Sequence, residues 1–342
     1  MGKKEKMAKY PLVSICTPTF NRRPFIPIII KCFENQTYPR NKMEWIIVDD
    51  GTDKIEDLVT HIPEVKYFRY EEKMTLGKKR NITNEKASGD IIIYMDDDDY
   101  YPSDRVSHAV ETLQKNPNYL IAGSSEMHIF FDSKNSIFQC GPYKEFHATA
   151  ATFAFKKELL NITRYEDEKT FAEENIFTKG YTIPLIQLDT LKTILVLSHK
   201  HNSLNKEKLL ENPQECRITP SRFKIDDFIK DPVLKQFYTC DMNKALENYE
   251  PGRPENKPEL MKQLKIREEE VNKRREEHYR QEHYRQEHYK TIQLQNTNTN
   301  IDALRNEYEK KIADKNLIIN ELLKKVKTLT IEIADYKLGK NI

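Results

Sequence analysis

Short apolar runs alternate with helical patterns between about residues 11 and 205, and this alternation limits the fold more than any other feature of the chain. The apolar, β-rich runs read LVSICT, EWIIVDD, VKYFRY, DIIIYM, YLIAGSS, ATFAF and TILVLS. The helical patterns between several of them read RPFIPIIIKCFENQ, DKIEDLVTHI, TLGKKRNITNEKAS and SDRVSHAVETLQKN. Such alternation predicts an α/β fold, with a mainly parallel, twisted sheet covered by helices on both faces. Gly89 follows the third helical pattern, where a C′ residue would end the helix.

The alternation stops near residue 205, and we therefore divide the chain into three parts. Residues 11–205 form the predicted α/β domain. Residues 206–258 carry six prolines and are predicted to be a helical or irregular extension and linker, in which residues 221–238 form one or two short helices that pack on the core. Residues 259–342 have the polar composition expected of one long, solvent-exposed helix or coiled coil.

The last part of the predicted long helix carries an apolar seam whose members recur mostly in steps of three and four residues. The seam consists of Ile301, Leu304, Tyr308, Ile312, Ile319, Leu322, Val326, Leu329, Ile333 and Tyr336. Lys315 occupies one core position, and an extra step of four near Ile312 is a stutter. The spacing predicts a coiled coil that joins copies of the chain into a homo-oligomer. A helix of another protein lying along the seam is the main alternative.

Charge and cysteine content argue against several classes of function. The chain has 56 basic and 54 acidic residues, so its net charge of +2 gives no indication of a nucleic-acid partner. Its five cysteines include no CxxC pair, which favours a reducing compartment over a disulfide framework or a cysteine zinc site. The basic N-terminus lacks an apolar signal core, and no apolar run is long enough to cross a bilayer. We therefore expect a soluble, cytoplasmic protein without a membrane span.

Three of the first four predicted strands end in polar clusters, which read CTPTFNR, VDDGTD and MDDDDYYP. In an open parallel sheet, ligands bind beyond the carboxyl ends of the strands, at the point where the strand order reverses. We therefore expect the three clusters to share one crevice. Lys78, Lys79 and Arg80 lie near a predicted helix start, where basic side chains can meet a diphosphate; a solvated basic helix face is the alternative.

The third cluster holds four consecutive carboxylates, Asp96 to Asp99, which repel one another when folding holds them together. Mg²⁺ and Mn²⁺ prefer oxygen ligands, and carboxylates two residues apart at a strand end can face the same way. The run therefore predicts a divalent cation site, with a solvated surface loop as the alternative. Tyr100 directly after the run excludes the DxDx(T/V) motif of HAD-type phosphatases, and TLGKKRN is not a P-loop.

The stretches VSICTPTFNR, WIIVDDGTD, LGKKRNITNEKASGDIIIYMDDDDYYP and FAEENIF occur in the order found in family 2 glycosyltransferases, which the sequence resembles over about residues 11–202. FHATAATFAFKKELL, AEENIFTKGYTIPLIQLD and KTILVLSHKHN look most like a branch found in large DNA viruses, which would place the protein in the host cytoplasm or the virion. The resemblance implies the GT-A fold, a nucleotide-sugar donor with a UDP-sugar favoured, and Mn²⁺ or Mg²⁺ bound by a DxD motif. The acceptor is expected to be a glycan or a protein.

The resemblance also implies which residues bind the donor and the cation. The implied nucleotide-binding set is Thr17, Pro18, Thr19, Arg22, Asp49, Asp50, Arg80, Asp96 and Asp97. Asp49 or Asp50 would accept a hydrogen bond from the base. Asp98 and Asp96 would bind the cation, and His201 is preferred to His199 as a further ligand. Because Pro102 comes earlier than in most of the family, the choice among the four aspartates stays open.

Glu173 and Glu174 stand where the family carries an acidic dyad before an aromatic residue, here Phe177. One of them would take the proton from the acceptor hydroxyl, and we predict Glu174 by its position, with Glu173 as the alternative. The family implies an inverting, single-displacement reaction, and the lack of a QxxRW motif favours transfer of a single sugar. A nucleotidyltransferase of the same fold and a nucleotide-binding coiled-coil scaffold without turnover are the alternative functions.

Overall fold

The computed structural model describes residues 9–214 and 216–339, except for the side chains of 294–298 and 335–339 in the last helix. Tyr336 of the predicted seam thus lies outside the described side chains. The chain separates into two compact units, Met1–Lys265 and Ile266–Ile342. No helix in the described ranges is both long enough and apolar enough to cross a membrane.

A seven-stranded sheet forms the centre of the first unit. Its strands are β1 (Val13–Thr19), β2 (Met43–Asp49), β3 (Val65–Arg69), β4 (Ile91–Tyr94), β5 (Ile121–Gly123), β8 (Ala154–Lys156) and β9 (Leu185–Gln187). They lie in the order β3-β2-β1-β4-β8-β5-β9, and only β8 runs antiparallel to its neighbours. The predicted α/β fold with a mainly parallel sheet is confirmed.

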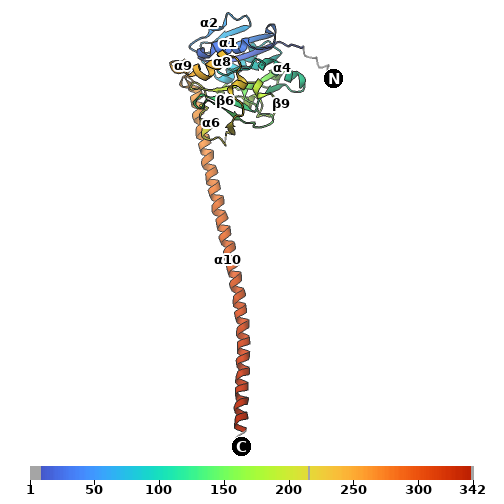
Figure 1. Cartoon of the computed structure of the whole chain (residues 1–342), viewed down its shortest axis with the longest axis vertical. Coiled ribbons are helices and arrows are strands. Elements are labelled where there is room, and N and C mark those ends of the chain that lie inside the picture. Colours follow the sequence, from blue (N-terminus) through green and yellow to red (C-terminus); the bar gives the residue numbers. More distant parts are fainter. Residues whose placement is uncertain (1–8, 215, 340–342) are drawn as a thin grey trace. The chain divides into compact units, whose positions relative to one another are not determined.

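Helices connect the strands and cover the sheet (Figure 1). Those of the first unit are α1 (Ile26–Glu34), α2 (Glu56–Val59), α3 (Leu76–Lys86), α4 (Arg105–Lys115), α5 (Glu174–Phe177), α6 (Lys208–Glu211), α7 (Ile225–Phe228), α8 (Pro232–Gln236) and α9 (Met242–Glu247). Short 3-10 helices lie at Arg23–Phe25, Arg40–Lys42, Asp132–Lys134, Ala150–Thr152, Lys157–Asn161, Thr190–Lys192 and Pro254–Asn256, and a π-helical turn at Phe237–Asp241. The helical patterns of the sequence correspond to α1 to α4, although α2 is shorter than its pattern.

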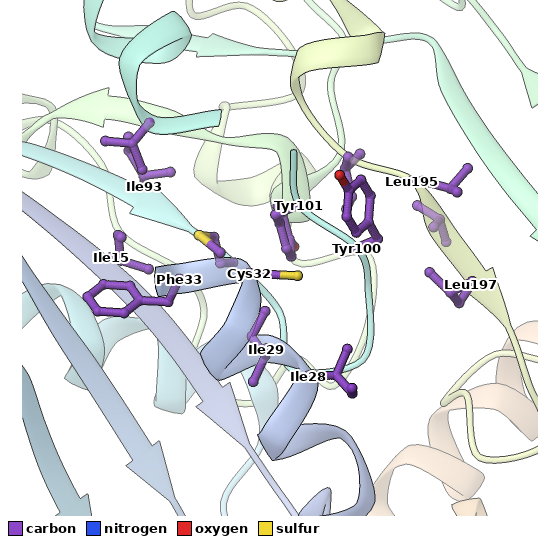
Figure 2. Close-up of a cluster of buried hydrophobic side chains, with 14 of the residues drawn as sticks. Ile15, Ile28, Ile29, Cys32, Phe33, Ile93, Tyr100, Tyr101, Leu195 and Leu197 are labelled. Carbon is purple, nitrogen blue, oxygen red and sulfur yellow. The ribbon is translucent and has the colours of Figure 1, made fainter. Parts of the chain in front are cut away.

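The central strands are apolar on both faces because both faces are covered. Ile15 and Ile93 point to one face, where they join a core that includes residues of α1 and α4. Figure 2 shows Ile29 and Phe33 of α1 in this cluster, together with Ile15 and Ile93 of the sheet. The alternate positions face a second core, in which Cys16, Ile46 and Ile92 pack with Phe153, Phe155, Tyr165 and Phe177.

The prediction that Gly89 is a C′ residue is wrong. α3 ends at Lys86, and its C-cap Ala87 has an extended backbone with φ −69° and ψ 128°. Gly89 instead lies against β1, where an added Cβ would be 2.6 Å from Ser14 N and 2.7 Å from Ser14 Oγ. Glycine is therefore required here by the close approach of the chain to β1.

A second sheet, which the apolar runs did not reveal, lies beside the first. Its strands β6 (Met127–Phe131), β7 (Ser136–Cys140), β10 (Val196–Ser198) and β11 (Ile218–Pro220) have the order β10-β6-β7-β11. The run TILVLS thus contributes β10 to this sheet and not to the central one. A bridge between Tyr100 and Leu195 links the start of this run to the end of the acidic cluster, which brings the residues after β10 to the crevice.

The extension after residue 205 packs on the first unit. α7 and α8 form within residues 221–238, as expected, and their Phe228 and Leu234 are buried in the larger core. The hydroxyl of Tyr238 donates to the carbonyl oxygen of Asp99 at 2.9 Å, so the extension also holds the acidic run in place. α10 (Pro258–Gly339) is one continuous helix of 82 residues, and Figure 1 shows no break along it.

Candidate active site

The order of the central strands reverses at β1, which lies between β2 and β4. The three polar clusters predicted at the ends of these strands therefore meet at one edge of the sheet. Arg22, which follows β1, donates from Nε to Asp98 Oδ2 of the third cluster at 3.3 Å. Lys79 of α3 donates to Asp50 Oδ1 at 2.8 Å and to the carbonyl oxygen of Thr19 at 3.0 Å. The three clusters thus contact one another at the predicted crevice.

The residues at the end of β1 are buried, so they support the crevice from inside the fold. Thr17 Oγ1 donates to the carbonyl oxygen of Met95 at 2.6 Å and accepts from Trp45 Nε1 at 2.9 Å, so its hydroxyl is used inside the fold. Pro18 and Thr19 are buried as well. Among the three residues predicted to line the pocket, Thr17 therefore fixes the spacing of β1 and β4.

Asp49 and Asp50 have different surroundings although they are neighbours. The carboxylate of Asp49 accepts from Gly51 N at 2.8 Å, Ile55 N at 3.1 Å and the Tyr67 hydroxyl at 2.7 Å. It therefore holds the loop after β2 together. Asp50 accepts from Met74 N at 2.6 Å and from Lys79, which places it on the side of the crevice. The side chain of Asp50 is fully buried, so both carboxylates are used inside the fold.

The four carboxylates of the acidic run differ in the direction of their pKa shifts. Burial alone would raise the pKa of Asp98, but the hydrogen bond from His199 and the charge of Arg22 hold this pKa well below its usual range. Burial and the charge of Asp98 raise the pKa of Asp97 to about 7 and that of Asp99 well above its usual range. Burial also raises the pKa of Asp96, against the charge of Arg80. The directions of these pKa shifts thus favour negative charge on Asp98 over its three neighbours.

His199, rather than His201, lies next to Asp98. His199 Nε2 is 3.2 Å from Asp98 Oδ2, and its ring packs on Phe25 with centroids 4.8 Å apart. The ring of His201 instead faces Tyr249, and neither of its nitrogens has a hydrogen-bond partner among the described residues. The preference for His201 therefore does not fit the geometry, because the short turn after β10 directs the two rings differently.

The ring of His199 is held by three polar contacts. Its Nδ1 accepts from His201 N at 3.2 Å, and its Nε2 lies 3.2 Å from Asp98 Oδ2 and 2.8 Å from Asn202 Nδ2. Burial lowers the pKa of His199 to about 4, although Asp98 opposes this shift. In this arrangement His199 orients Asp98 rather than offering a lone pair to a cation.

The carboxylates of the run fit a cation that takes few protein ligands. Among the described residues, no group of three or more His, Cys, Asp and Glu side chains lies close enough to enclose a metal ion. Asp96 and Asp98 retain side-chain exposures of 24% and 16%, whereas Asp97 retains 9%. Mg²⁺ commonly takes one or two carboxylates and completes its shell with waters and substrate phosphates. Asp98 and Asp96 are the most exposed of these carboxylates, and they contact Arg22 and Arg80, respectively.

Arg80 joins the acidic run to the acidic dyad. Its Nε donates to Glu173 Oε1 at 2.7 Å, and its two terminal nitrogens lie 3.3 Å from the two oxygens of Asp96. The guanidinium also lies 4.6 Å from the ring centroid of Tyr94 and is almost fully buried. Arg80, predicted to contact the base or the diphosphate, is therefore a positioning residue in this structure.

Replacing Arg80 is expected to destabilise the fold strongly. Arg80→Met leaves Asp96 and buried Glu173 without their shared cation, which should lower the free energy of unfolding by about 3 kcal/mol at neutral pH. Urea denaturation followed by tryptophan fluorescence measures this change. Arg164→Met, which removes an exposed pair with Asp167, should change it by less than about 1 kcal/mol. Equal small effects of both substitutions would contradict the assigned role.

The two members of the acidic dyad differ in access. Glu173 is buried and bound to Arg80, whereas Glu174 begins α5 and is only half-buried. Ala172, directly before the dyad, has φ +52°, a left-handed backbone that is rare for alanine and sharply turns the chain towards the crevice. Both glutamates raise the pKa of Tyr181, which reaches about 12 mainly through burial. Glu174 is thus the more accessible member of the dyad.

Two lysines that the sequence did not indicate, together with His199, lie near the acidic run. His199, Lys206 and Lys257 all influence Asp98 or its neighbours, and Lys206 Nζ donates to the carbonyl oxygen of Leu197 at 3.1 Å. Lys206 and Lys257 lie in the extension, where no motif marks a functional residue. Only the tertiary fold could reveal them.

Comparison with known proteins identifies the domain that carries this crevice. The family model described as glycosyl transferase family 2 matches residues 14–164. An uncharacterized glycosyltransferase of Haemophilus influenzae is 32% identical over 111 residues, which are 31% of this chain and 44% of the relative. The putative teichuronic acid biosynthesis glycosyltransferase TuaG of Bacillus subtilis is 32% identical over 110 residues, which are 31% of this chain and 43% of the relative. The chain thus matches less than half of the length of either relative.

Among solved structures, S. aureus TarS 1–349 in complex with UDP-GlcNAc is similar, with a TM-score of 0.47 and 19% identity. The similarity covers 55% of this chain and 59% of that one. The family match includes the three strand-end clusters, while Glu173, Glu174 and His199 lie beyond it. Through residues 14–164, the chain is thus similar to glycosyl transferase family 2.

Proposed function

We propose that the chain transfers a single sugar from a nucleotide-sugar donor, with a UDP-sugar favoured, to a hydroxyl of a glycan or protein acceptor. The observation that carries the proposal is the meeting of three polar strand ends within the family match, where Arg80 joins Asp96 to Glu173. The nucleotide would lie along the ends of β1 and β2, with Asp50 and Lys79 beside it.

The acidic run would face the diphosphate of the donor. Asp98, assisted by Asp96, would hold Mn²⁺ or Mg²⁺, and such an ion supplies positive charge next to the diphosphate. Arg22 contributes a further cation there and is held by the carbonyl oxygens of Gly252 and His201 at 3.1 and 2.8 Å. His199 keeps Asp98 oriented and ionised.

Glu174 would act as the general base for the transfer. The acceptor oxygen attacks the anomeric carbon while the bond from that carbon to the diphosphate oxygen breaks on the opposite face. The hydroxyl proton goes to Glu174, and the bonding electrons leave with the nucleoside diphosphate. One in-line displacement inverts the anomeric configuration. Arg80 holds Glu173 beside the base and so supports the position of the dyad.

A donor hydrolysis assay tests the proposed function. The full chain is incubated with a panel of nucleotide sugars, with Mn²⁺ or with a chelator, and released nucleoside diphosphate is measured. Release from one donor that requires the metal supports a glycosyltransferase and identifies its sugar. Release of inorganic diphosphate would instead indicate a nucleotidyltransferase. Binding of nucleotide without any turnover would indicate a scaffold.

We further propose that copies of the chain associate through α10. The seam residues Ile319, Leu322, Val326, Leu329 and Ile333 have exposures of 51–59% within a single chain. An apolar seam with heptad spacing is stabilised when a second helix covers it.

Leu329→Lys is expected to reduce the assembly to single chains at micromolar concentration, because it places a charge in the seam. Light scattering coupled to size-exclusion chromatography measures the mass. Ile331→Lys is the matched control, since Ile331 is equally exposed at 54% but two residues off the seam. An unchanged mass for Leu329→Lys would refute self-association through this seam.

A further inference from the structure

The segment from Tyr249 to Lys257 lies in the extension after residue 205. It is held at the crevice by hydrogen bonds to residues that are far from it in the sequence. The hydroxyl of Tyr249 donates to Asp53 Oδ2 at 2.8 Å, and Asn21 Nδ2 donates to the carbonyl oxygen of Pro251 at 2.9 Å. Arg22 donates to the carbonyl oxygen of Gly252 at 3.1 Å. The segment is therefore part of the crevice wall.

Gly252 lets the segment approach this closely. A Cβ on Gly252 would lie 2.8 Å from the carbonyl oxygen of Asn21 and 2.8 Å from His201 Nδ1. Because two backbones and a buried ring converge at this point, the position of the following residues is tightly determined. Lys257, five residues later, is thereby brought to the crevice.

The ammonium group of Lys257 lies among other cations. Its Nζ is 5.7 Å from the ring centroid of Phe20, and the Nζ atoms of Lys79 and Lys73 lie 5.7 and 5.5 Å from the same ring. Lys79 is paired with Asp50 and Lys73 with Glu259, at 2.8 and 2.6 Å. Three ammonium groups thus surround one buried ring at the end of β1.

Lys257 differs from the other two lysines in its partner. Its Nζ donates to Ser203 Oγ at 2.9 Å, and no carboxylate of the described residues lies within ion-pair distance of it. Burial, together with the charges of Arg22 and Lys79, holds the pKa of Lys257 well below its usual range, and Asp98 and Asp97 oppose this shift only in part. A desolvated cation without an anion is costly unless a ligand supplies the negative charge.

We propose that Lys257 binds the diphosphate of the nucleotide, together with Arg22 and Lys79, so that the extension supplies a residue of the donor site. This inference rests on the proposed function. A diphosphate between these three groups would give Lys257 its missing anion and offset the repulsion among the cations.

Binding measurements on the full chain test this proposal without requiring the acceptor. The affinities for UDP, GDP, inorganic diphosphate and uridine are measured by calorimetry in the presence of a chelator and again with Mn²⁺. For the diphosphate that the wild type binds, Lys257→Met is expected to weaken binding about 10- to 100-fold and to leave any uridine affinity unchanged. Lys257→Arg keeps the cation and is expected to stay within about threefold of wild type. Lys262→Met, an exposed position on α10, is the matched control and should bind as wild type does.

The outcomes separate this inference from the proposed function. Wild-type diphosphate affinity in Lys257→Met would overturn the role of Lys257 and leave the proposed function intact. Equal losses for UDP and uridine would also overturn it, because they would indicate a distorted site. If the wild type binds no UDP, GDP or inorganic diphosphate even with Mn²⁺, both the inference and the proposed function fail. A thermal unfolding midpoint close to that of wild type is expected for Lys257→Met, since removal of a costly buried charge offsets loss of the hydrogen bond to Ser203.

Discussion

Asp98→Asn is expected to reduce metal-dependent release of nucleoside diphosphate by about 10³-fold, which corresponds to about 4 kcal/mol in the activation barrier. The substitution keeps the shape of the side chain but removes the carboxylate that the fold keeps ionised through His199 and Arg22. The assay is donor hydrolysis with Mn²⁺ and with a chelator. Wild type should lose activity in chelator, whereas the variant should respond little to Mn²⁺.

Two substitutions control the Asp98 experiment. Asp104→Asn changes an aspartate six residues away whose partner is Lys192 at 3.7 Å, and it should retain activity. Asp97→Asn should cost less than about tenfold, because burial and Asp98 already raise the pKa of Asp97 to about 7. Full turnover by Asp98→Asn in metal-free buffer would refute the metal assignment. Thermal unfolding of each variant shows whether the fold is retained.

Glu174→Gln is expected to lower kcat for donor hydrolysis by about 10²- to 10⁴-fold, the usual contribution of a general base. In this assay water takes the place of the acceptor hydroxyl and must give up its proton in the same way. Glu174 is half-buried at the start of α5 and is the more accessible member of the dyad, so the substitution should leave the unfolding midpoint close to that of wild type. The affinity for UDP should also change little.

Glu173→Gln is the matched comparison, because the same chemical change is made one residue earlier. Glu173 is buried and receives the Arg80 Nε hydrogen bond at 2.7 Å, so this variant should lose stability as well as activity. The roles of the two glutamates can thus be distinguished by the effects of the two substitutions on kcat and on the unfolding midpoint. Full kcat in Glu174→Gln, with loss of kcat but a normal unfolding midpoint in Glu173→Gln, would transfer the role of base to Glu173.

The main features of the central sheet were predictable because they depend on local patterns. Apolar runs such as EWIIVDD are buried along their whole length in β2, and the helical pattern SDRVSHAVETLQKN became α4 at Arg105–Lys115. The second sheet was missed because β6 and β7 are short strands in a stretch without clear alternation. The role of Gly89 was predicted wrongly because glycine is required there by the close approach of Ser14, a residue 75 positions away in the sequence.

By itself, the sequence determined the α/β fold and the polar ends of β1, β2 and β4, because residue periodicity sets strands and helices and parallel strands end on one edge. Only the tertiary structure decided that negative charge is favoured on Asp98, that His199 faces it, that Arg80 joins Asp96 to Glu173, and that Lys257 reaches the crevice. The physical reason is that charge, burial and hydrogen bonding depend on neighbours in space. Those neighbours come from elements up to 230 residues apart, as in the contact between Arg22 and Gly252.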